Sequence, residues 1–355
     1  MRFRSILSEA GRNLVTGTSR ALLFALLLAA VTAGAAIMDA RTVIGVQRRA
    51  ADFVASGASV RVMVAPAMTD AASCERLATV AGVRAAGALR ESGAVVLRTM
   101  NANPVPAYSV TPGLIAVLGG DPAAPAGAWL PAPLARTLGV QPGQELPTAS
   151  GTLTVAGLYD YPDDGRDSRL AYAALLPEPA AGSFDECWAD IWPLSRDREQ
   201  LLHAALDVDA SAADAVTVGQ LNTSRGNRFD ALAEFTGRPT RFGLPACALA
   251  GLLIGLAAVR IRRLELAAAL HLGESRRDLL ATQVIETAAW SGAAVVLAAV
   301  ALLAGVTAAG PEDAAAVYLV DVRGPLAAVC AALIGAVLGV LTVRERHLFR
   351  YFKNR

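Results

Sequence analysis

Few side chains in this sequence have the types and spacing that catalysis needs. Its only histidines are His203, His271 and His347. A Ser-His-Asp triad requires a histidine beside an activated serine, and the G-x-S-x-G motif of one large hydrolase class does not occur in the chain. His203 lies in a run with helical periodicity, 199–206, and we expect it on the surface of that helix. We therefore expect no catalytic residue in this chain.

An acidic cluster is the one arrangement that suggests a metal. Asp163, Asp164 and Asp167 lie close together in the polar segment 160–169. A Ca²⁺ site is one interpretation, but the regular ligand spacing of an EF-hand loop is missing. We interpret the segment as a solvated loop. A single outer histidine also cannot form a histidine-rich zinc site, so we expect no metal.

Nucleotide hydrolysis through a P-loop is excluded. That motif reads G-x-x-x-x-G-K-[ST], and its lysine binds the phosphates. Lys353 is the only lysine of the chain, and no such motif surrounds it. No cofactor is expected in this chain, and any ATP and Mg²⁺ would be held by a partner protein.

The four cysteines fall into two pairs. Cys247 and Cys330 lie in apolar runs, where a free cysteine behaves as a small apolar residue. Cys74 and Cys187 lie in the long segment between the first two apolar runs. A bridge between them would close a loop of over a hundred residues and contribute about 4–5 kcal/mol in the chain-entropy model. The sequence leaves open whether their Cα atoms come close enough to bond.

The elements that hold these residues are mostly apolar. Hydrophobic residues make up 54% of the 355, and four long windows contain no charge. A helix needs roughly 20 apolar residues to cross a membrane. We expect a membrane protein with four transmembrane α-helices at 21–40, 242–259, 287–309 and 324–343. A large α+β extracytoplasmic domain, residues 41–241, is expected between the first helix and the second.

The distribution of arginines predicts the orientation. They precede the first span, lie between the second and third, and follow the fourth, whereas 310–323 is mainly acidic. By the positive-inside rule, both termini, the 260–286 loop and the 344–355 tail are cytoplasmic, and 310–323 is a short outer loop. Residues 1–20 read as a cytoplasmic amphipathic helix. A cleaved signal peptide, with Ala33-Gly34-Ala35 as the cleavage site, is the alternative.

The outer domain alternates strand and helix patterns. Residues 59–64 and 151–158 alternate polar and apolar side chains as half-buried strands do. Residues 71–80 have a helical pattern, and the segment 119–133 is rich in Pro, Gly and Ala. We expect an α+β domain with candidate subdomains at 57–118 and 119–221.

Residues 260–286 form a charged, amphipathic segment between two apolar runs. A helical pattern is interrupted at Leu272-Gly273 and resumes at Ser275. Ser275 can cap a new helix, and Asp278 is spaced to complete a capping box. We predict a helix, a bend at glycine and a second, capped helix.

This segment resembles a known family. Residues 265–280, E-L-A-A-A-L-H-L-G-E-S-R-R-D-L-L, resemble the E-I-G-x-x-R-A-L-G-A-S-x-x-x-I loop of the FtsX/MacB-type ABC permeases, in which a second Glu lies near the next span. Residues on the pattern are Glu265, Leu272, Gly273, Ser275, Leu279 and Glu286; departures are Ala267, Leu270, His271 and Glu274. Residues 134–158 are also similar to the A-x-x-L-G-x-x-x-G-D-x-I…V-x-G pattern of the family's outer domain, and the expected topology agrees.

The resemblance implies a permease subunit of a bacterial cell membrane that docks on a separate cytoplasmic P-loop ATPase. It also implies a second permease chain, identical or different. The candidate docking residues are Glu265, Leu272, Gly273, Glu274, Ser275, Arg276 and Arg277. The alternative is that the arginines of this segment only anchor to anionic membrane lipid and set the topology. We expect no nucleic-acid partner.

Within that family the outcome differs. Members export an amphiphile, antibiotic or peptide, extract lipoproteins, or regulate a cell-wall hydrolase without transport, and an outer protein or substrate is a further partner. The uncharged spans favour transmission of force over passage of a polar solute. A rival class is a membrane-anchored extracytoplasmic binding or sensor protein without an ATPase. Gly335 and Gly339 form a G-x-x-x-G motif, a candidate dimer seam.

Overall fold

The computed structural model describes residues 3–207 and 216–344, which divide into two compact units. A helical unit comprises the chain up to Arg48 and from Ala231 onward, and a sheet unit comprises Arg49–Asp230. Residues 345–355 of the predicted tail, with His347 and Lys353, lie outside the described residues.

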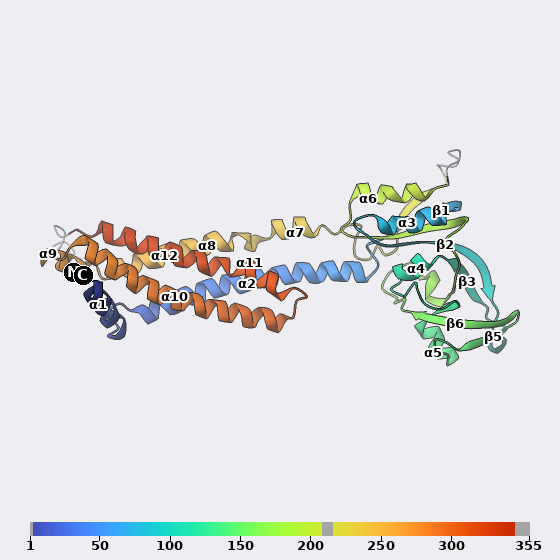
Figure 1. The fold of residues 1–355 in the computed structure, drawn as a ribbon, viewed down its shortest axis with the longest axis horizontal. Coiled ribbons are helices and arrows are strands. Elements are labelled where there is room, and N and C mark those ends of the chain that lie inside the picture. The colour runs from blue at the N-terminus through green and yellow to red at the C-terminus, as the bar shows by residue number, and fades with distance from the viewer. Residues whose placement is uncertain (1–2, 208–215, 345–355) are drawn as a thin grey trace. The chain divides into compact units, whose positions relative to one another are not determined.

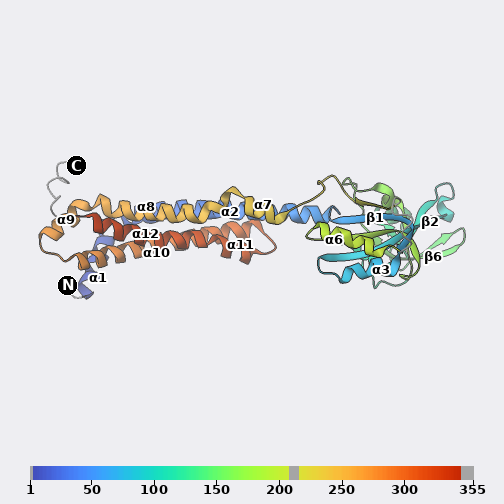
Figure 2. The same ribbon diagram turned by 90° about the horizontal axis from the view of Figure 1, so that it is seen from above.

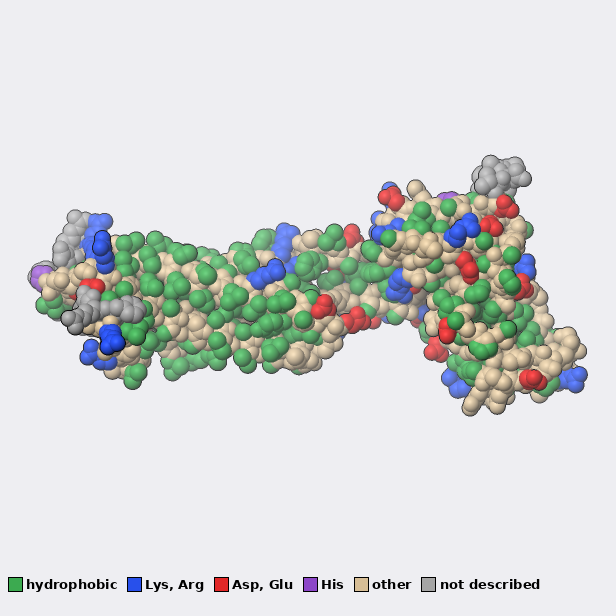
Figure 3. All heavy atoms as spheres, viewed as in Figure 1, with side chains coloured by type: hydrophobic (Ala, Val, Ile, Leu, Met, Phe, Trp, Pro, Cys, Tyr) green, Lys and Arg blue, Asp and Glu red, His purple; other side chains and the backbone are tan. Residues whose placement is uncertain are grey.

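The helical unit contains long apolar helices separated by short turns. Its elements are α1 Phe3–Val15, α2 Ala21–Ala55 (which continues past Arg48 into the sheet unit), α7 Ala231–Gly237, a 3₁₀ turn Pro239–Phe242, α8 Gly243–Ile261, α9 Arg263–His271, α10 Arg276–Ala309, α11 Ala314–Asp321 and α12 Arg323–Thr342. Within the described residues, four helical segments are long and apolar enough to cross a membrane: 21–55, 239–261, 276–309 and 314–342. Hydrophobic side chains cover the middle of this unit (Figure 3).

The long helices lie side by side, with α1 and α9 at one end of the unit and α7 and α11 at the other (Figures 1 and 2). Two connections differ from the sequence prediction. The connection 310–323, predicted as an outer loop, contains α11, because the Asp313 side chain accepts from the Ala316 backbone N–H at 2.9 Å and starts a helix there. The N-terminal helix ends at Val15 rather than at residue 20, and Gly17 adopts φ +74° in the turn that follows.

Helices α8 and α12 pack through two facing rows of small residues. A Cβ on Gly251 or Gly255 would lie 2.1 Å from the carbonyl oxygen of Ala328 or Ala332 on α12. In return, a Cβ on Gly335 would lie 2.2 Å from the Leu252 carbonyl oxygen. Only glycine lets the two backbones approach this closely.

This packing involves the two glycines that the sequence predicts as a dimer seam. Gly335 and Gly339 are buried against α8 of the same chain, where a Cβ on Gly339 would lie 2.8 Å from Val259 Cβ. The G-x-x-x-G motif does promote close helix approach, but the partner helix is intramolecular. A G-x-x-x-G motif indicates small residues on one face of a helix but does not identify the helix that packs against that face.

The sheet unit has nine strands among the described residues, in the order β5-β6-β4-β7-β3-β2-β8-β1-β9. The strands are β1 Val60–Asp70, β2 Val83–Val95, β3 Val105–Val110, β4 Ala128–Pro131, β5 Glu145–Thr148, β6 Gly151–Tyr159, β7 Ala174–Pro177, β8 Ser183–Ile191 and β9 Thr217–Gln220. The helices are α3 Ala71–Arg76, α4 Pro112–Val117, α5 Ala132–Leu138 and α6 Arg196–Gln200, with 3₁₀ turns at Leu77–Thr79, Arg98–Met100, Ser168–Tyr172 and Leu201–Ala205. Most pairs are antiparallel, but β3 pairs with β7, and β4 with β6, in parallel.

Strand β8 organises this unit because both of its faces are buried. Cys187, Ala189 and Ile191 face one apolar cluster, and Trp188 faces another. The Trp188 indole donates to Glu186 at 2.8 Å, and Glu186 also accepts two hydrogen bonds from Arg169 at 2.5 and 2.7 Å. Burying a carboxylate is tolerated when its oxygens are paired in this way.

The two candidate subdomains, 57–118 and 119–221, do not form separate sheets. Strand β8 lies between β1 and β2, and β7 lies beside β3, so strands of the second range complete the sheet of the first. A strand that is buried on both faces needs neighbours on both edges, and those neighbours come from distant parts of the chain. The turn-rich segment 119–133 is therefore a connection within one unit.

The two outer-domain cysteines are bonded to each other. Cys74 on α3 and Cys187 on β8 form a disulfide with a Cα–Cα distance of 5.8 Å. The bridge fastens α3 to the central strand. Cys247 and Cys330 are free.

Candidate functional site

A bent segment joins α8 to α10, and we call residues 262–277 the elbow. Helix α8 ends at Ile261, and Arg262 adopts φ −95° and ψ 10°, which interrupts the helix before α9 begins. The Arg262 side chain is only 10% exposed and points into the helical unit. The first bend of the elbow is therefore formed at a buried arginine.

The second bend is formed at Gly273. This residue has φ +91°, in the left-handed region that favours glycine. The Gly273 N–H donates to the Leu270 carbonyl and the Glu274 N–H donates to the Ala269 carbonyl, both at 3.1 Å. These two bonds form a Schellman motif, which satisfies the last carbonyls of α9.

Ser275 starts α10, as the capping pattern predicts. Its hydroxyl oxygen accepts from the Asp278 backbone N–H at 3.2 Å and donates to the Asp278 carboxylate at 2.9 Å. The predicted arrangement of helix, glycine bend and capped helix is therefore present between α9 and α10.

The outer surface of the elbow is exposed and mixed in character. Leu272 is 88% exposed, and Arg276 and Arg277 are also exposed. Glu274 is half-buried, and its Oε1 has no hydrogen-bond partner among the described residues. Burial, together with the negative charges of Glu9 and Asp278, raises the pKa of Glu274. An apolar tip beside two arginines and an acceptor without a partner is a surface suited to a protein partner.

The inner side of the elbow is held by Glu286 on α10. Its carboxylate accepts from Arg262 Nη1 at 2.6 Å, from Asn13 Nδ2 of α1 at 2.7 Å and from Gln283 Nε2 at 3.4 Å. The Glu286 side chain is only 3% exposed. One carboxylate thus connects the start of the elbow to α10 and to the N-terminal helix.

Apolar packing supports the same attachment. Leu266 and Ala267 of α9 are buried in a cluster with Leu279 of α10 and with α8 and α12. Glu265 lies at the edge of this inner face: it accepts from Arg262 Nε at 3.0 Å, and its side chain is 56% exposed. The elbow is therefore a packed extension of the helices and not a loose loop.

The sequence-predicted docking residues from Leu272 to Arg277 are adjacent on the second bend, whereas Glu265 lies beside Arg262. Arg262 is buried in an ion pair, which rules out the lipid-anchor interpretation for that one arginine. Glu286 matches the family pattern, but the sequence does not predict it as a docking residue. The signal for it was an acidic residue at the border of an apolar run, where an unpaired charge is costly.

Other chemical candidates do not assemble into a site. Arg166 binds Asp164 through Nε at 2.9 Å and Nη2 at 2.7 Å, and this hydrogen bonding lowers the pKa of Asp164. The acidic loop is thus held by an arginine. His203 is exposed, as expected. Within residues 3–207 and 216–344 no group of three or more His, Cys, Asp or Glu side chains could hold a metal.

The chain has only weak similarity to known proteins. No protein-family model matches the chain, and no curated protein matches it significantly. The periplasmic region of MacB from Actinobacillus actinomycetemcomitans is similar with 10% identity and a TM-score of 0.32 over 46% of this chain and 89% of that one. A domain of a putative permease protein from Porphyromonas gingivalis is similar with 14% identity and a TM-score of 0.31 over 46% of this chain and 90% of that one. At TM-scores this low, the two likenesses establish no family for this chain.

Proposed function

We propose that this chain is the transmembrane permease subunit of a bacterial ABC transporter of the FtsX/MacB type. In this proposal it crosses the cell membrane four times, with both termini and the elbow in the cytoplasm, and a separate P-loop ATPase holds ATP and Mg²⁺. The observation that supports it is the elbow itself. Its outer surface is exposed and its inner side is locked to α10 and α1 through Glu286.

A lock of this kind would allow a partner to move the spans. A partner that grips Leu272 and the following residues applies its load to α9, and buried contacts pass the load to α10 and α1. A flexible loop would absorb such a displacement. Two arrangements of packed helices, one of which the ATPase binds better, would then form the switch.

A second permease chain is part of the proposal. Gly335 and Gly339 are covered by α8, and we therefore place the contact between chains on other helix faces. Whether the switch exports an amphiphile or peptide or transmits force to an outer protein depends on the sheet unit and its ligand.

The docking surface can be tested by co-expressing the full-length chain with each P-loop ATPase encoded near its gene and purifying the complex in mild detergent. Leu272→Glu should reduce ATPase co-purification by about tenfold, because it places a charge at an apolar contact. Val15→Glu is a matched control, since Val15 is 89% exposed on α1 at the same end of the unit. ATPase recovery that is equal for wild type and Leu272→Glu would remove the elbow as the docking surface.

One observation favours the rival function, a membrane-anchored binding or sensor protein. The sheet unit has an open cleft of about 650 Å³ whose lining includes Arg196, His203 and Arg228, while Arg61 in its wall is paired with Glu199 at 2.7 Å. Such a cleft could take an anionic ligand without any ATPase. Labelling of an introduced cysteine at Leu272 from the outside of intact cells would support the rival and exclude the permease.

A further inference from the structure

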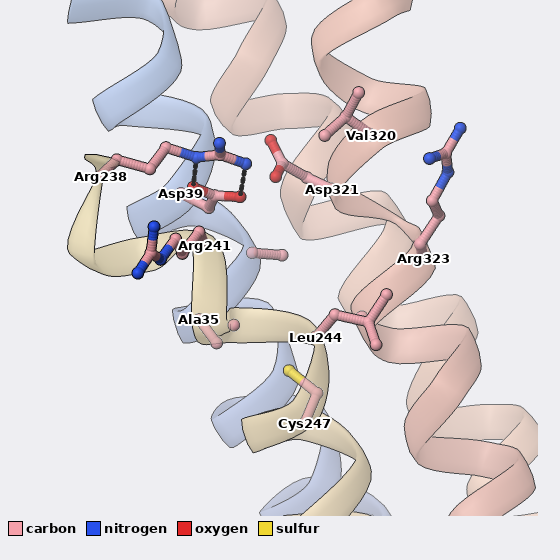
Figure 4. Close-up of a pocket in the computed structure, with 12 residues that line it drawn as sticks. Ala35, Asp39, Arg238, Arg241, Leu244, Cys247, Val320, Asp321 and Arg323 are labelled. Carbon is pink, nitrogen blue, oxygen red and sulfur yellow. Dashed lines mark hydrogen bonds and ion pairs between the residues drawn. The ribbon is translucent and has the colours of Figure 1, made fainter. Parts of the chain in front are cut away.

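A second buried charge cluster lies at the opposite end of the helical unit from the elbow. It combines Asp39 of α2, Arg238 between α7 and the 3₁₀ turn, and Asp321 at the end of α11 (Figure 4). These side chains line a cavity of about 160 Å³. Neither the elbow nor its proposed partner involves this cavity.

Arg238 is fully engaged by its neighbours. Its Nε and Nη2 donate to the two Asp39 carboxylate oxygens at 2.7 and 3.2 Å, and its Nη1 donates to the Phe235 carbonyl at 2.6 Å. The guanidinium also lies over the Phe235 ring at 3.9 Å. Asp39 and Arg238 therefore neutralise each other.

Within the described residues Asp321 lies beside Asp39, and no arginine binds it as Arg238 binds Asp39. The residue is 5% exposed, and its Oδ2 is buried with no hydrogen-bond partner among the described residues. Figure 4 shows the carboxylate directed into the cavity, toward the Asp39–Arg238 pair. A buried carboxylate oxygen without a donor costs more than an ordinary lost hydrogen bond.

The remaining arginines that line the cavity, Arg241 and Arg323, do not bind the Asp321 carboxylate in the structure described. Arg241 donates to the Thr236 carbonyl at 2.8 Å and lies over the Phe242 ring at 4.7 Å. Arg323 is exposed and points away from Asp321 (Figure 4). The inner wall thus carries two carboxyl groups, Asp39 and Asp321, that face a single bound arginine. Apolar side chains lie beside them, among them Ala35, Leu244 and Val320.

We propose that this cavity binds the ammonium group of an amphiphile, with Asp321 as its acceptor. An ammonium supplies the donors and the positive charge that Asp321 Oδ2 lacks, and such charge-assisted bonds are stronger than neutral ones. A cavity of about 150 Å³ is large enough for a ligand the size of benzene. The first carbons of the alkyl chain contact the apolar wall. The ammonium comes from a membrane lipid headgroup or from a free alkylamine.

The test uses the full-length chain in neutral maltoside micelles without any ATPase, so its result is independent of the proposed function. Binding of dodecylammonium and of dodecyl sulfate is measured by native mass spectrometry. The two probes share a chain length and differ in charge. Wild type should bind dodecylammonium about tenfold or more tightly than dodecyl sulfate. Equal binding, or a preference for the sulfate, would assign the cavity to its arginines and overturn the proposal.

A variant pair locates the acceptor. Asp321→Asn keeps the side-chain size and removes the charge, and it should abolish the preference for dodecylammonium. Glu312→Gln removes an exposed carboxyl from the same connection and should keep the preference. A preference that survives Asp321→Asn contradicts the assignment. If Asp321→Asn does not fold, the comparison of the two probes on wild type still decides.

The source of the ammonium is distinguished in lipid nanodiscs. Retention of phosphatidylethanolamine, in preference to phosphatidylglycerol, by wild type and not by Asp321→Asn supports a lipid headgroup as the ligand. Binding of added dodecylammonium without any such lipid preference supports a free amphiphilic amine. Absence of both from wild type overturns the proposal.

Discussion

The two ends of the helical unit differ in how completely their buried arginine and carboxyl groups are paired. Each end has an arginine that is only 10% exposed and that binds a carboxylate from a helix: Arg262 binds the buried Glu286, and Arg238 binds the partly buried Asp39. Each arginine also lies near a second carboxylate. At the elbow this is Glu265, which is hydrogen-bonded and 56% exposed, and at the other end it is Asp321, which is buried and has an oxygen without a partner.

The difference separates a structural lock from a binding site. Buried charges are tolerated when each one is paired and its hydrogen bonds are complete. The elbow meets this condition, because the second carboxylate reaches solvent. The Asp321 end does not, which leaves a place for an external cation. Each of the following predictions tests that contrast.

The largest effect is expected at the elbow. Glu286→Gln leaves Arg262 buried without its closest counter-charge and should lower stability by about 3 kcal/mol, at the lower end of the range for breaking a buried pair because Glu265 remains. The measurement is thermal unfolding of the full-length chain in detergent. Glu265→Gln is the exposed control and should cost about 0–1 kcal/mol.

A double variant separates lost pairing from lost packing. Arg262→Met with Glu286→Met removes both charges and should be less destabilised than Glu286→Gln alone, since no buried charge is left unpaired. A double variant that is less stable than Glu286→Gln would show that the pair acts through packing, and the lock would have to be reassigned.

The middle of the unit should respond to size and not to charge. Gly255→Ala would place a Cβ 2.1 Å from the Ala332 carbonyl oxygen and force α8 away from α12. Overpacking of this kind costs about 1–3 kcal/mol. Gly292→Ala is the matched control: a Cβ there has no neighbour within 4 Å, so the change should be neutral or stabilising. Equal melting temperatures for both variants would contradict the close approach.

At the Asp321 end of the helical unit, removal of a carboxylate charge should raise stability, whereas at the elbow it should lower stability. Asp321→Asn removes one of two neighbouring carboxyl groups that face a single arginine, so stability without ligand should rise by about 1 kcal/mol, or roughly 2–4 °C in melting temperature. The corresponding carboxylate-to-amide substitution at the elbow, Glu286→Gln, should instead destabilise the protein. A fall at Asp321 comparable to that at Glu286 would show that Asp321 is paired in the absence of ligand, and the two ends would then be alike.

Local features of the fold were predictable from the sequence. The uncharged runs predicted four apolar helices, and Gly273 with Ser275 predicted the bend and the new helix start, because a left-handed turn and an N-cap each depend on a single residue type. The pairing of β8 between β1 and β2 was not predictable, because it joins residues such as Val62 and Trp188 that are far apart in the chain.

The sequence also could not predict which helix or side chain each residue contacts. The sequence identified Gly335 and Gly339 as a surface for close helix approach, but the helix that covers them is α8 of the same chain. Glu286 and Asp321 likewise look similar as single acids at the borders of apolar runs. Only the arrangement of Arg262 and Arg238 in space distinguishes a satisfied carboxylate from one with an unpaired oxygen.

The smallest expected effect is a dependence on pH at the exposed side of the elbow. Burial and the charges of Glu9 and Asp278 raise the pKa of Glu274 above its ordinary value of 4.5. The folded elbow therefore binds this proton more tightly than the unfolded chain does. The resulting stabilisation is complete below the unfolded pKa and is lost as the pH rises through the raised folded pKa. At neutral pH, Glu274→Gln should melt slightly above wild type, and the difference should shrink as the pH falls below 4.5. A bound ATPase that donates a hydrogen bond to Glu274 Oε1 would instead favour the charged form. Glu274→Gln would then melt below wild type in the complex, so the same comparison also tests docking.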